Sequence, residues 1–212
     1  WYWEVLAITM GGNYGNIGIT NDLHRAAVAG TGVFYGNDGK RNPAAFNSGT
    51  TSYGATYTDG DIIGIAFDAD NESVNFYKNN TAQGAVGSVL TASNGPYFAS
   101  VGDAQNTTTY AYHANFGQDS SFAGAKTAQG NADSNGVGDF FYSPPSGFLA
   151  LASSNLPEPD IIDGTENFNT VLYTGNASTN AITGVGFSPD WVWIKNRGRA
   201  GQGHVLHDTV RG

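Results

Sequence analysis

The sequence predicts an all-β protein that consists mainly of an antiparallel β-sandwich. Glycine is frequent, with 30 residues in a chain of 212, while 13% of the residues are aromatic and only 13% are charged. This composition is typical of strands joined by tight turns. No long stretch repeats apolar residues at the three- and four-residue spacing of an amphipathic helix. The length allows one large domain or two modest ones, and either can bury a core.

The most informative stretch is residues 59–80, DGDIIGIAFDADNESVNFYKNN, which predicts a β-hairpin. In its first strand, 61–67, one face is large and apolar and the other is smaller, as expected for a strand buried between two layers. The second strand, 73–78, alternates apolar and polar residues, so one of its faces is expected to be wet. The turn contains side chains that hydrogen-bond to their own backbone and tolerate positive φ: Asp68, Asp70 and Asn71. If Asn71 adopts positive φ, proline will not be tolerated there.

The hairpin has the form GDxIGxxxD, an acidic turn, and a strand that ends FYKN. This pattern resembles the central hairpin of SPRY domains, which are concanavalin A-like β-sandwiches of the jelly-roll type. Other stretches resemble SPRY strands in the order of that family: WYWEV at 1–5, NIGIT at 16–20, GVFYGNDGK at 32–40, YFASV at 97–101 and NFGQ at 115–118. The resemblance covers roughly residues 1–118. It implies the fold and partner binding through loops, but no chemistry, because one fold hosts many functions.

Residues 126–140, KTAQGNADSNGVGDF, are rich in Gly, Asn and Asp and predict an irregular segment. Oxygen-rich loops suit calcium, so one interpretation is a site built from Asp133, Asn135 and Asp139. The other interpretation is a loop without metal. It is favoured because no bidentate glutamate stands at the right offset. We therefore expect no metal site and no cofactor.

Residues 140–159 end in SGFLALASSNLPEP, a phrase that resembles segments found after lectin-like domains in tail and other structural proteins of bacteriophages. Phe148, Leu149 and Leu151 are expected to pack on the sandwich, while Pro157 and Pro159 stiffen an extended exit. We therefore predict three parts: a SPRY-like sandwich over 1–155, a proline-containing linker over 156–167 and a partial second β module over 168–212.

The second module contains a predicted strand at 187–195, FSPDWVWIK. Together with HVLHDTVRG at 204–212, it resembles a repeated module of phage virion proteins. The stretch is too short for the complete module, so we expect it to be truncated or completed by another chain. Basic side chains gather at its end: Arg197, Arg199, His204, His207 and Arg211. One interpretation is that these side chains bind a phosphate or an acidic glycan. The other, which we favour, is that they lie on a solvated strand edge and turn.

Charge and residue inventory argue against several function classes. Nine Lys and Arg against 18 Asp and Glu give a net charge of -9, which opposes a nucleic-acid-binding surface. The absence of cysteine excludes disulfides and thiol catalysis, and no apolar run is long enough to insert in a membrane. Concanavalin-like glucanases need two carboxylates across one groove, yet the glutamates lie far apart in the sequence: Glu4, Glu72, Glu158 and Glu166. We expect no enzyme and no catalytic residues.

The resemblances together favour a non-enzymatic structural and binding module of a phage virion appendage, similar to a tail fibre. Its location would be the extracellular virion particle, and its partners other virion subunits or copies of itself. A host-surface glycan or protein is the expected ligand. Two alternatives stay open: a glycan-cleaving concanavalin-like domain and a purely architectural capsid or fibre protein.

A ligand site is expected in loops at one end of the sandwich. The candidates combine flat aromatic rings, amides and a guanidinium, which suit sugars and carboxylates: Tyr14, Asn16, Tyr35, Asn37, Asp38 and Arg41. The alternative is that Tyr35 is buried in the sandwich and the others only turn the chain.

Overall fold

The computed structural model describes residues 1–21, 32–42, 51–87, 90, 95–103 and 109–211. The chain divides into two compact units, Trp1–Leu156 and Pro157–Gly212. Helix in the described ranges is limited to two 3-10 turns, η2 (Ser153–Asn155) and η3 (Gly164–Glu166). No helix of these ranges is long and apolar enough to cross a membrane. The predicted all-β class is confirmed.

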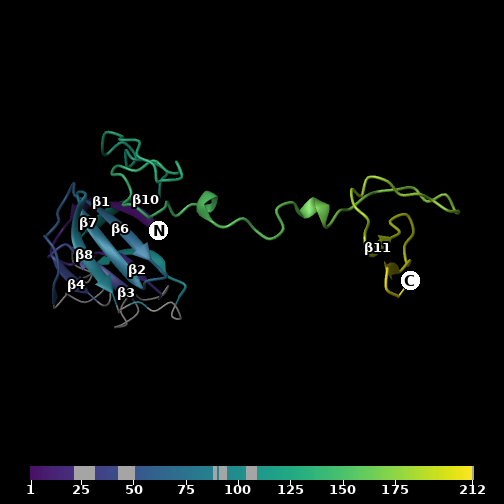
Figure 1. Cartoon of the computed structure of the whole chain (residues 1–212), viewed down its shortest axis with the longest axis horizontal. Coiled ribbons are helices and arrows are strands. Elements are labelled where there is room, and N and C mark those ends of the chain that lie inside the picture. The colour runs from purple at the N-terminus through teal and green to yellow at the C-terminus, as the bar shows by residue number, and fades with distance from the viewer. Residues whose placement is uncertain (22–31, 43–50, 88–89, 91–94, 104–108, 212) are drawn as a thin grey trace. The chain divides into compact units, whose positions relative to one another are not determined.

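The first unit is a sandwich of two five-stranded antiparallel sheets (Figure 1). The first sheet has the order β10-β1-β6-β7-β8, with bounds Tyr110–Asn115, Tyr2–Met10, Ile62–Asp68, Ser73–Lys78 and Thr81–Gly87. The second has the order β5-β4-β3-β2-β9, with bounds Thr51–Ser52, Lys40–Asn42, Gly32–Gly36, Gly15–Thr20 and Phe98–Asp103. This is the β-sandwich that the sequence predicts.

The predicted hairpin is formed by β6 and β7, which pair with Ile65 opposite Phe76. Both side chains are fully buried in the core between the sheets. The small opposite face of β6 is also explained, because a Cβ at Gly64 would lie 2.7 Å from the hydroxyl oxygen of Tyr2 on β1. Only glycine leaves room there for the tyrosine ring.

The turn of the hairpin is organised by Asp68. Its Oδ1 accepts the backbone amides of Asp70 at 3.1 Å and Asn71 at 3.0 Å, and its Oδ2 accepts the side-chain amide of Asn71 at 2.7 Å. The residue with positive φ is Glu72, at 52°. The aspartate-capped turn is as expected, but the left-handed position is one residue later than the sequence suggested.

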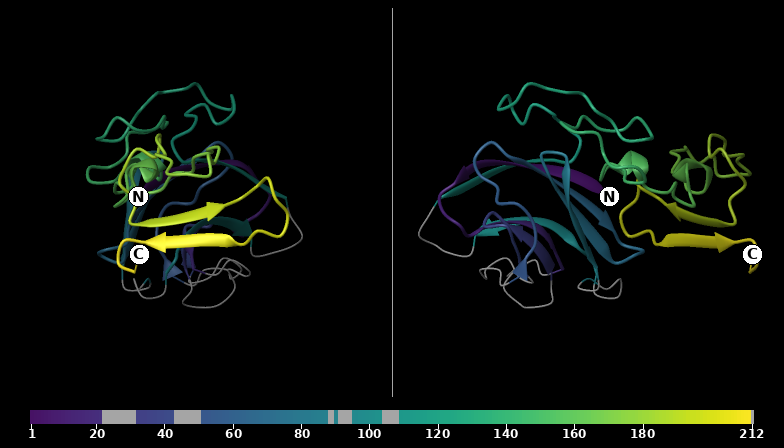
Figure 2. Two further views of the ribbon diagram at one scale, coloured as in Figure 1. Left: turned by 90° about the vertical axis from the view of Figure 1, so that its right-hand side faces the viewer. Right: turned by 60° about the vertical axis from the view of Figure 1, so that its left-hand side comes forward.

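Residues 117–152 lie over the outer face of the first sheet (Figure 2). Phe140 and Ala150 pack there against Tyr2 and Ala66, and Phe122 packs against Leu6 in a neighbouring cluster. The chain also adds a parallel bridge between Tyr2 and Ala150. The segment therefore forms a third layer on the sandwich. Residues 126–140 are irregular, as the sequence predicts, and Phe148 packs against the cluster that contains Tyr2, as expected.

Two buried carboxylates hold this layer. Glu4 on β1 accepts the backbone amides of Phe141 and Tyr142, both at 2.8 Å. Asp133 accepts the backbone amides of Asn135 and Val137 at 2.9 Å and that of Ala150 at 2.8 Å. Both carboxylate oxygens of Asp133 therefore accept hydrogen bonds from N–H groups. A calcium ligand must instead direct its oxygen lone pairs at the ion. Among the described residues no group of three or more His, Cys, Asp or Glu could hold a metal ion.

Two strands differ from the sequence expectation. The last strand of the sandwich, β10, ends at Asn115, so it contains only the first residue of the NFGQ stretch. Residues 81–87 form the edge strand β8, which the sequence did not predict. Its glycines and polar residues gave no apolar alternation by which a strand could be recognised.

In the second unit, β11 (Trp191–Lys195) and β12 (His204–Asp208) form an antiparallel pair. The strand predicted around Trp191 and Trp193 is therefore present, and both rings are exposed. Of the basic residues noted at this end, Arg211 forms an ion pair with Asp208 at 2.8 Å.

Candidate functional site

Three connecting segments of the sandwich converge on one cavity of about 470 Å³, which we call the polar cleft. The segments are the loop from β1 to β2, the turn from β3 to β4, and the stretch that precedes β6. They contribute the lining residues Gly12 and Asn13, Asn37, and Thr56 to Thr58, while Lys78 enters from the end of β7. The cleft thus combines amide, hydroxyl and ammonium groups in one concave surface.

Asn37 connects the three segments. Its backbone amide donates to the carbonyl of Gly15 at 2.9 Å, while its Oδ1 accepts the amide of Gly15 at 3.1 Å. Its Nδ2 donates to the carbonyl of Gly12 at 2.5 Å, and its carbonyl accepts the amide of Tyr57 at 3.1 Å. The residue is only 5% exposed. Such a saturated, buried amide fixes the walls of the cleft relative to each other.

A group of tyrosines lies beneath the cleft. Tyr57 is buried, and its hydroxyl lies 3.1 Å from the carbonyl of Tyr35 and 3.2 Å from that of Gly15. The Tyr35 ring is 5.2 Å from the Tyr57 ring and 5.3 Å from the Tyr53 ring, both edge-on. The Tyr35 hydroxyl donates to the carbonyl of Ala55. Burial raises the pKa of Tyr57 and Tyr35 far above 10, and that of Tyr53 to about 12.

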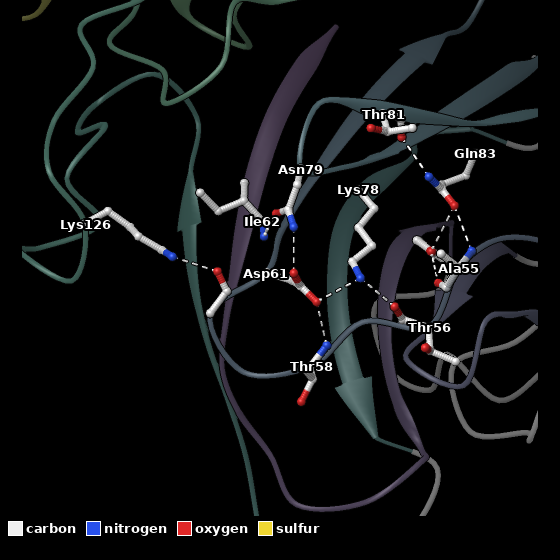
Figure 3. Close-up of polar contacts among 12 residues, drawn as sticks. Ala55, Thr56, Thr58, Asp61, Ile62, Lys78, Asn79, Thr81, Gln83 and Lys126 are labelled. Atoms are coloured by element: carbon white, nitrogen blue, oxygen red, sulfur yellow. Dashed lines mark hydrogen bonds and ion pairs between the residues drawn. The ribbon is translucent and has the colours of Figure 1, made fainter.

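Lys78 is held at one side of the cleft by an ion pair (Figure 3). Its Nζ donates to the carbonyl of Thr56 at 2.8 Å and lies 3.2 Å from Oδ2 of Asp61. Asp61 also accepts the amide of Thr58 at 2.9 Å and the side-chain amide of Asn79 at 2.6 Å. Burial raises the pKa of Asp61, but these hydrogen bonds and the lysine outweigh it and leave the pKa below its ordinary value.

The cleft can therefore offer a ligand a definite set of groups. A lysine ammonium has three donors, and two oxygens of the described residues engage that of Lys78. One N–H remains for a ligand. The side chains of Asn13, Thr56 and Thr58 are exposed and add an amide and two hydroxyls. Because Asp61 balances the lysine, the arrangement suits a polar, hydroxyl-rich ligand better than a strongly charged one.

The structure separates the residues that the sequence nominated. Asn37 lines the cleft, but Tyr35 and Asn16 are 0% and 1% exposed, so their side chains support the loops from inside. Asp38 forms an ion pair with Lys40 at 3.0 Å. The last two are half-buried: the backbone amide of Tyr14 donates to the hydroxyl of Tyr110, and Arg41 on β4 lies opposite Tyr35. The buried position of Tyr35 matches the alternative that the sequence left open.

Sequence reasoning missed Lys78, Asn13, Thr56 and Thr58. Lys78 ends a strand whose alternation was recognised, but its partner Asp61 stands directly before the preceding strand, β6. An acidic residue at the start of one hairpin strand and a basic residue at the end of the next lie at the same end of the hairpin. That signal was available, since antiparallel neighbours place those positions side by side.

Comparison with known proteins identifies the first unit. The SPRY domain family matches residues 1–119, and a domain of unknown function (DUF7483) matches residues 163–212. A search of curated proteins finds no match. Among solved structures, a human SPRY domain is similar, with 18% identity, a TM-score of 0.42, and coverage of 53% of this chain and 74% of that one. Since the family matches more than half of its residues, the chain belongs to the SPRY domain family.

Proposed function

We propose that this protein is a non-enzymatic binding and structural module of a phage virion appendage, and that its polar cleft recognises a host-surface glycan. Membership of the SPRY family supports a binding role, because SPRY domains are generally non-catalytic modules that mediate protein interactions. The observation that carries the proposal is the cleft itself. Its walls are locked by Asn37, while Lys78, Asn13 and the two threonines remain available to a ligand.

The lining favours a glycan over a peptide as the ligand. Sugars present many hydroxyls, which need alternating donors and acceptors, and amides and hydroxyls supply both. The exposed lining contributed by Asn13, Thr56 and Thr58 is polar, and the aromatic ring of Tyr57 is buried. A peptide anchor would require an apolar pocket for a large side chain, which this lining does not provide.

The virion setting rests on the second unit and on the segment that precedes it. The phrase SGFxALxSxNLPEP and the pattern around Trp191 resemble segments of phage structural proteins. The second unit also exposes large apolar side chains, including Phe168, Leu172 and Trp193. Neighbouring virion subunits or further copies of the chain are the partners that would cover them. Mass spectrometry of purified particles tests this part, since the chain must be present in particles if the proposal holds.

A glycan array tests the ligand, using the wild type and two lysine variants. Lys78→Met keeps the aliphatic stem but removes the ammonium from the cleft. Lys126→Met is the matched control, because Lys126 Nζ likewise donates to a loop carbonyl, that of Gly60 at 2.7 Å, without lining the cleft (Figure 3). We expect binding by the wild type and by Lys126→Met, and loss of binding by Lys78→Met with the unfolding temperature retained.

Three results would oppose the proposal. If the wild type binds no glycan but captures a host-surface protein, the ligand class is wrong and the interaction is of the protein type. If Lys78→Met binds as the wild type does while both are folded, the polar cleft is not the site. Polysaccharide cleavage by the wild type would instead favour the glycan-cleaving alternative.

A further inference from the structure

A second cavity of about 340 Å³ opens at the other end of the strands, and we call it the aromatic cavity. β1 runs from Trp3 in this cavity to Met10 in the polar cleft, so the sandwich separates the two. The walls are aromatic and come from both sheets, with Trp1, Trp3, Phe67 and Tyr97 among them. The rings of Phe67 and Tyr97 meet edge-on at 5.7 Å. The two sheets therefore leave an aromatic recess between them at this end.

The charged side chains that line the aromatic cavity are all acidic. Asp70 and Glu72, both in the turn between β6 and β7, line it together with the rings. Asp70 is exposed and Glu72 half-exposed, whereas Trp3 and Phe67 are 2% and 8% exposed. The carboxylates therefore lie at the mouth and the rings lie deeper. No lysine or arginine of the described residues lines the cavity.

The turn holds the two carboxylates in place. Asp68 accepts the amides of Asp70 and Asn71, which fixes the backbone between β6 and β7. Glu72 is kept at a φ of 52°, in the left-handed region that residues other than glycine seldom adopt. A strained residue at the rim of a cavity is a common sign of a positioned functional group.

We propose that the aromatic cavity binds a lysine or arginine side chain of a partner protein. The apolar walls accommodate the aliphatic stem, and a ring face turned toward the charged head favours a cation over a neutral group. The two carboxylates at the mouth then pair with the charged head. The cavity lies at the small end of the range for ligand sites, about 300 to 1,000 Å³, so it fits one side chain.

Other ligand classes fit less well. An anion meets two carboxylates, in a chain whose net charge is already -9. A sugar needs both donors and acceptors for its hydroxyls, whereas the carboxylates of Asp70 and Glu72 at the mouth of this cavity only accept. The aromatic cavity is separate from the polar cleft, so a negative binding result for one site does not contradict the proposal for the other.

Titration followed by NMR tests the proposal on the whole chain, with the indole N–H signals of Trp1 and Trp3 as reporters. The probes are N-acetyl-lysine methylamide and N-acetyl-arginine methylamide, and N-acetyl-norleucine methylamide is the neutral comparator of similar shape. We expect saturable shifts at the two indoles, with a cationic probe binding about fivefold tighter than norleucine. Added salt is expected to narrow that difference.

Charge-neutral variants supply the controls. Asp70→Asn combined with Glu72→Gln is expected to reduce binding of the cationic probes to the norleucine level. Glu158→Gln combined with Asp160→Asn removes the same charge from the second unit, at two exposed positions, and is expected to leave binding unchanged. Dispersed amide spectra establish that each variant is folded. Tyr97→Leu, which removes one ring, is expected to weaken the cationic probes more than norleucine.

The proposal is overturned by any of three results. The first is the absence of indole shifts with every probe. The second is equal affinity for norleucine and the cationic probes, which would make the cavity a site for apolar groups. The third is unchanged binding of the cationic probes by the folded Asp70 and Glu72 double variant.

Discussion

The Glu4 carboxylate accepts the backbone amide of Phe141 at 2.8 Å across 137 residues of sequence. Tyr142, Tyr2 and Asn115 donate to the same carboxylate, at 2.8, 3.2 and 3.3 Å. Burial raises the pKa of Glu4, and these hydrogen bonds oppose that rise. One side chain of the opening strand thus fastens the third layer to the sandwich.

Replacement of Glu4 by glutamine tests this attachment. Glutamine has the same shape, but its NH₂ group must face a backbone N–H or the Asn115 amide, so at least one buried donor loses its acceptor. We expect a loss of about 1–3 kcal/mol in the free energy of unfolding. Hydrogen exchange is expected to rise at Phe141 and Tyr142 before it rises in β6. Glu158→Gln, at an exposed position, is the control and should behave as the wild type does. Unaltered exchange in Glu4→Gln would mean that the layer is held by its apolar contacts alone.

Asp133 is expected to make the stability of the third layer depend on pH in the acid range. Burial raises its pKa, but hydrogen bonds from Ala150, Val137, Asn155 and Asn135 outweigh this and hold the pKa below 3.8. A lowered folded pKa means that the stabilisation is present above the unfolded value and is lost as pH falls through the folded value. Asp133→Asn is therefore expected to lower stability at neutral pH, by about 1–3 kcal/mol, and to flatten the acid branch of a stability profile. An acid branch as steep as that of the wild type would assign the dependence to other carboxylates.

The tyrosines beneath the polar cleft predict sensitivity to alkali. Their folded pKa values lie above the ordinary value of 10, because burial disfavours the phenolate. Stability is therefore fully present below about pH 10 and falls as the pH rises further, since the unfolded chain then releases protons that the folded chain keeps. Unfolding temperatures measured across this range check the direction. Tyr57→Phe is expected to cost about 1 kcal/mol at neutral pH and to reduce the alkaline slope. Tyr173→Phe, at an exposed position of the second unit, should change neither quantity.

The left-handed φ of Glu72 predicts a stabilising substitution. Glycine adopts φ near 52° without the Cβ penalty, so Glu72→Gly is expected to raise the free energy of unfolding by about 0.5–1 kcal/mol. Valine, which is β-branched, is expected to lower it. Chemical denaturation measures both. If glycine and valine have the same effect, the turn does not hold residue 72 in the left-handed region.

The sequence predicted the sandwich well, because the information for it is local. Alternation in β6 and β7 placed Ile65 and Phe76 in the core, and the small face of β6 at Gly64 indicated a second covering layer. In the third layer the sequence predicted only the packing of Phe148, Leu149 and Leu151, since the preceding segment is rich in glycine, asparagine and aspartate. The third layer is held by Glu4 and Asp133, which accept hydrogen bonds from backbone amides. These amides carry no sequence signal, and that of Phe141 is distant in sequence from Glu4.

The candidate site was predicted at the level of loops but not of side chains. Asn37 and the loop that contains Asn13 do meet in the polar cleft. For Tyr35 the sequence left a ligand-binding ring and a buried ring open. The residue occupies a strand position whose side chain points between the sheets, where Tyr57 and Phe76 surround it. Lys78 reaches the cleft from the end of another strand. The composition of a loop cannot show which of its polar groups form hydrogen bonds within the protein and which are left for a ligand.

NMR mapping of a bound glycan tests the central claim most directly. The glycan is the one that binds best on the array, titrated into isotope-labelled wild type and into Lys78→Met. We predict saturable shifts at the amides of Gly12, Asn13, Thr56 and Thr58, with little change at Trp3 and Tyr97, and loss of these shifts in Lys78→Met. Shifts confined to the aromatic cavity or the second unit, or a shift pattern that survives Lys78→Met, would contradict recognition through the polar cleft.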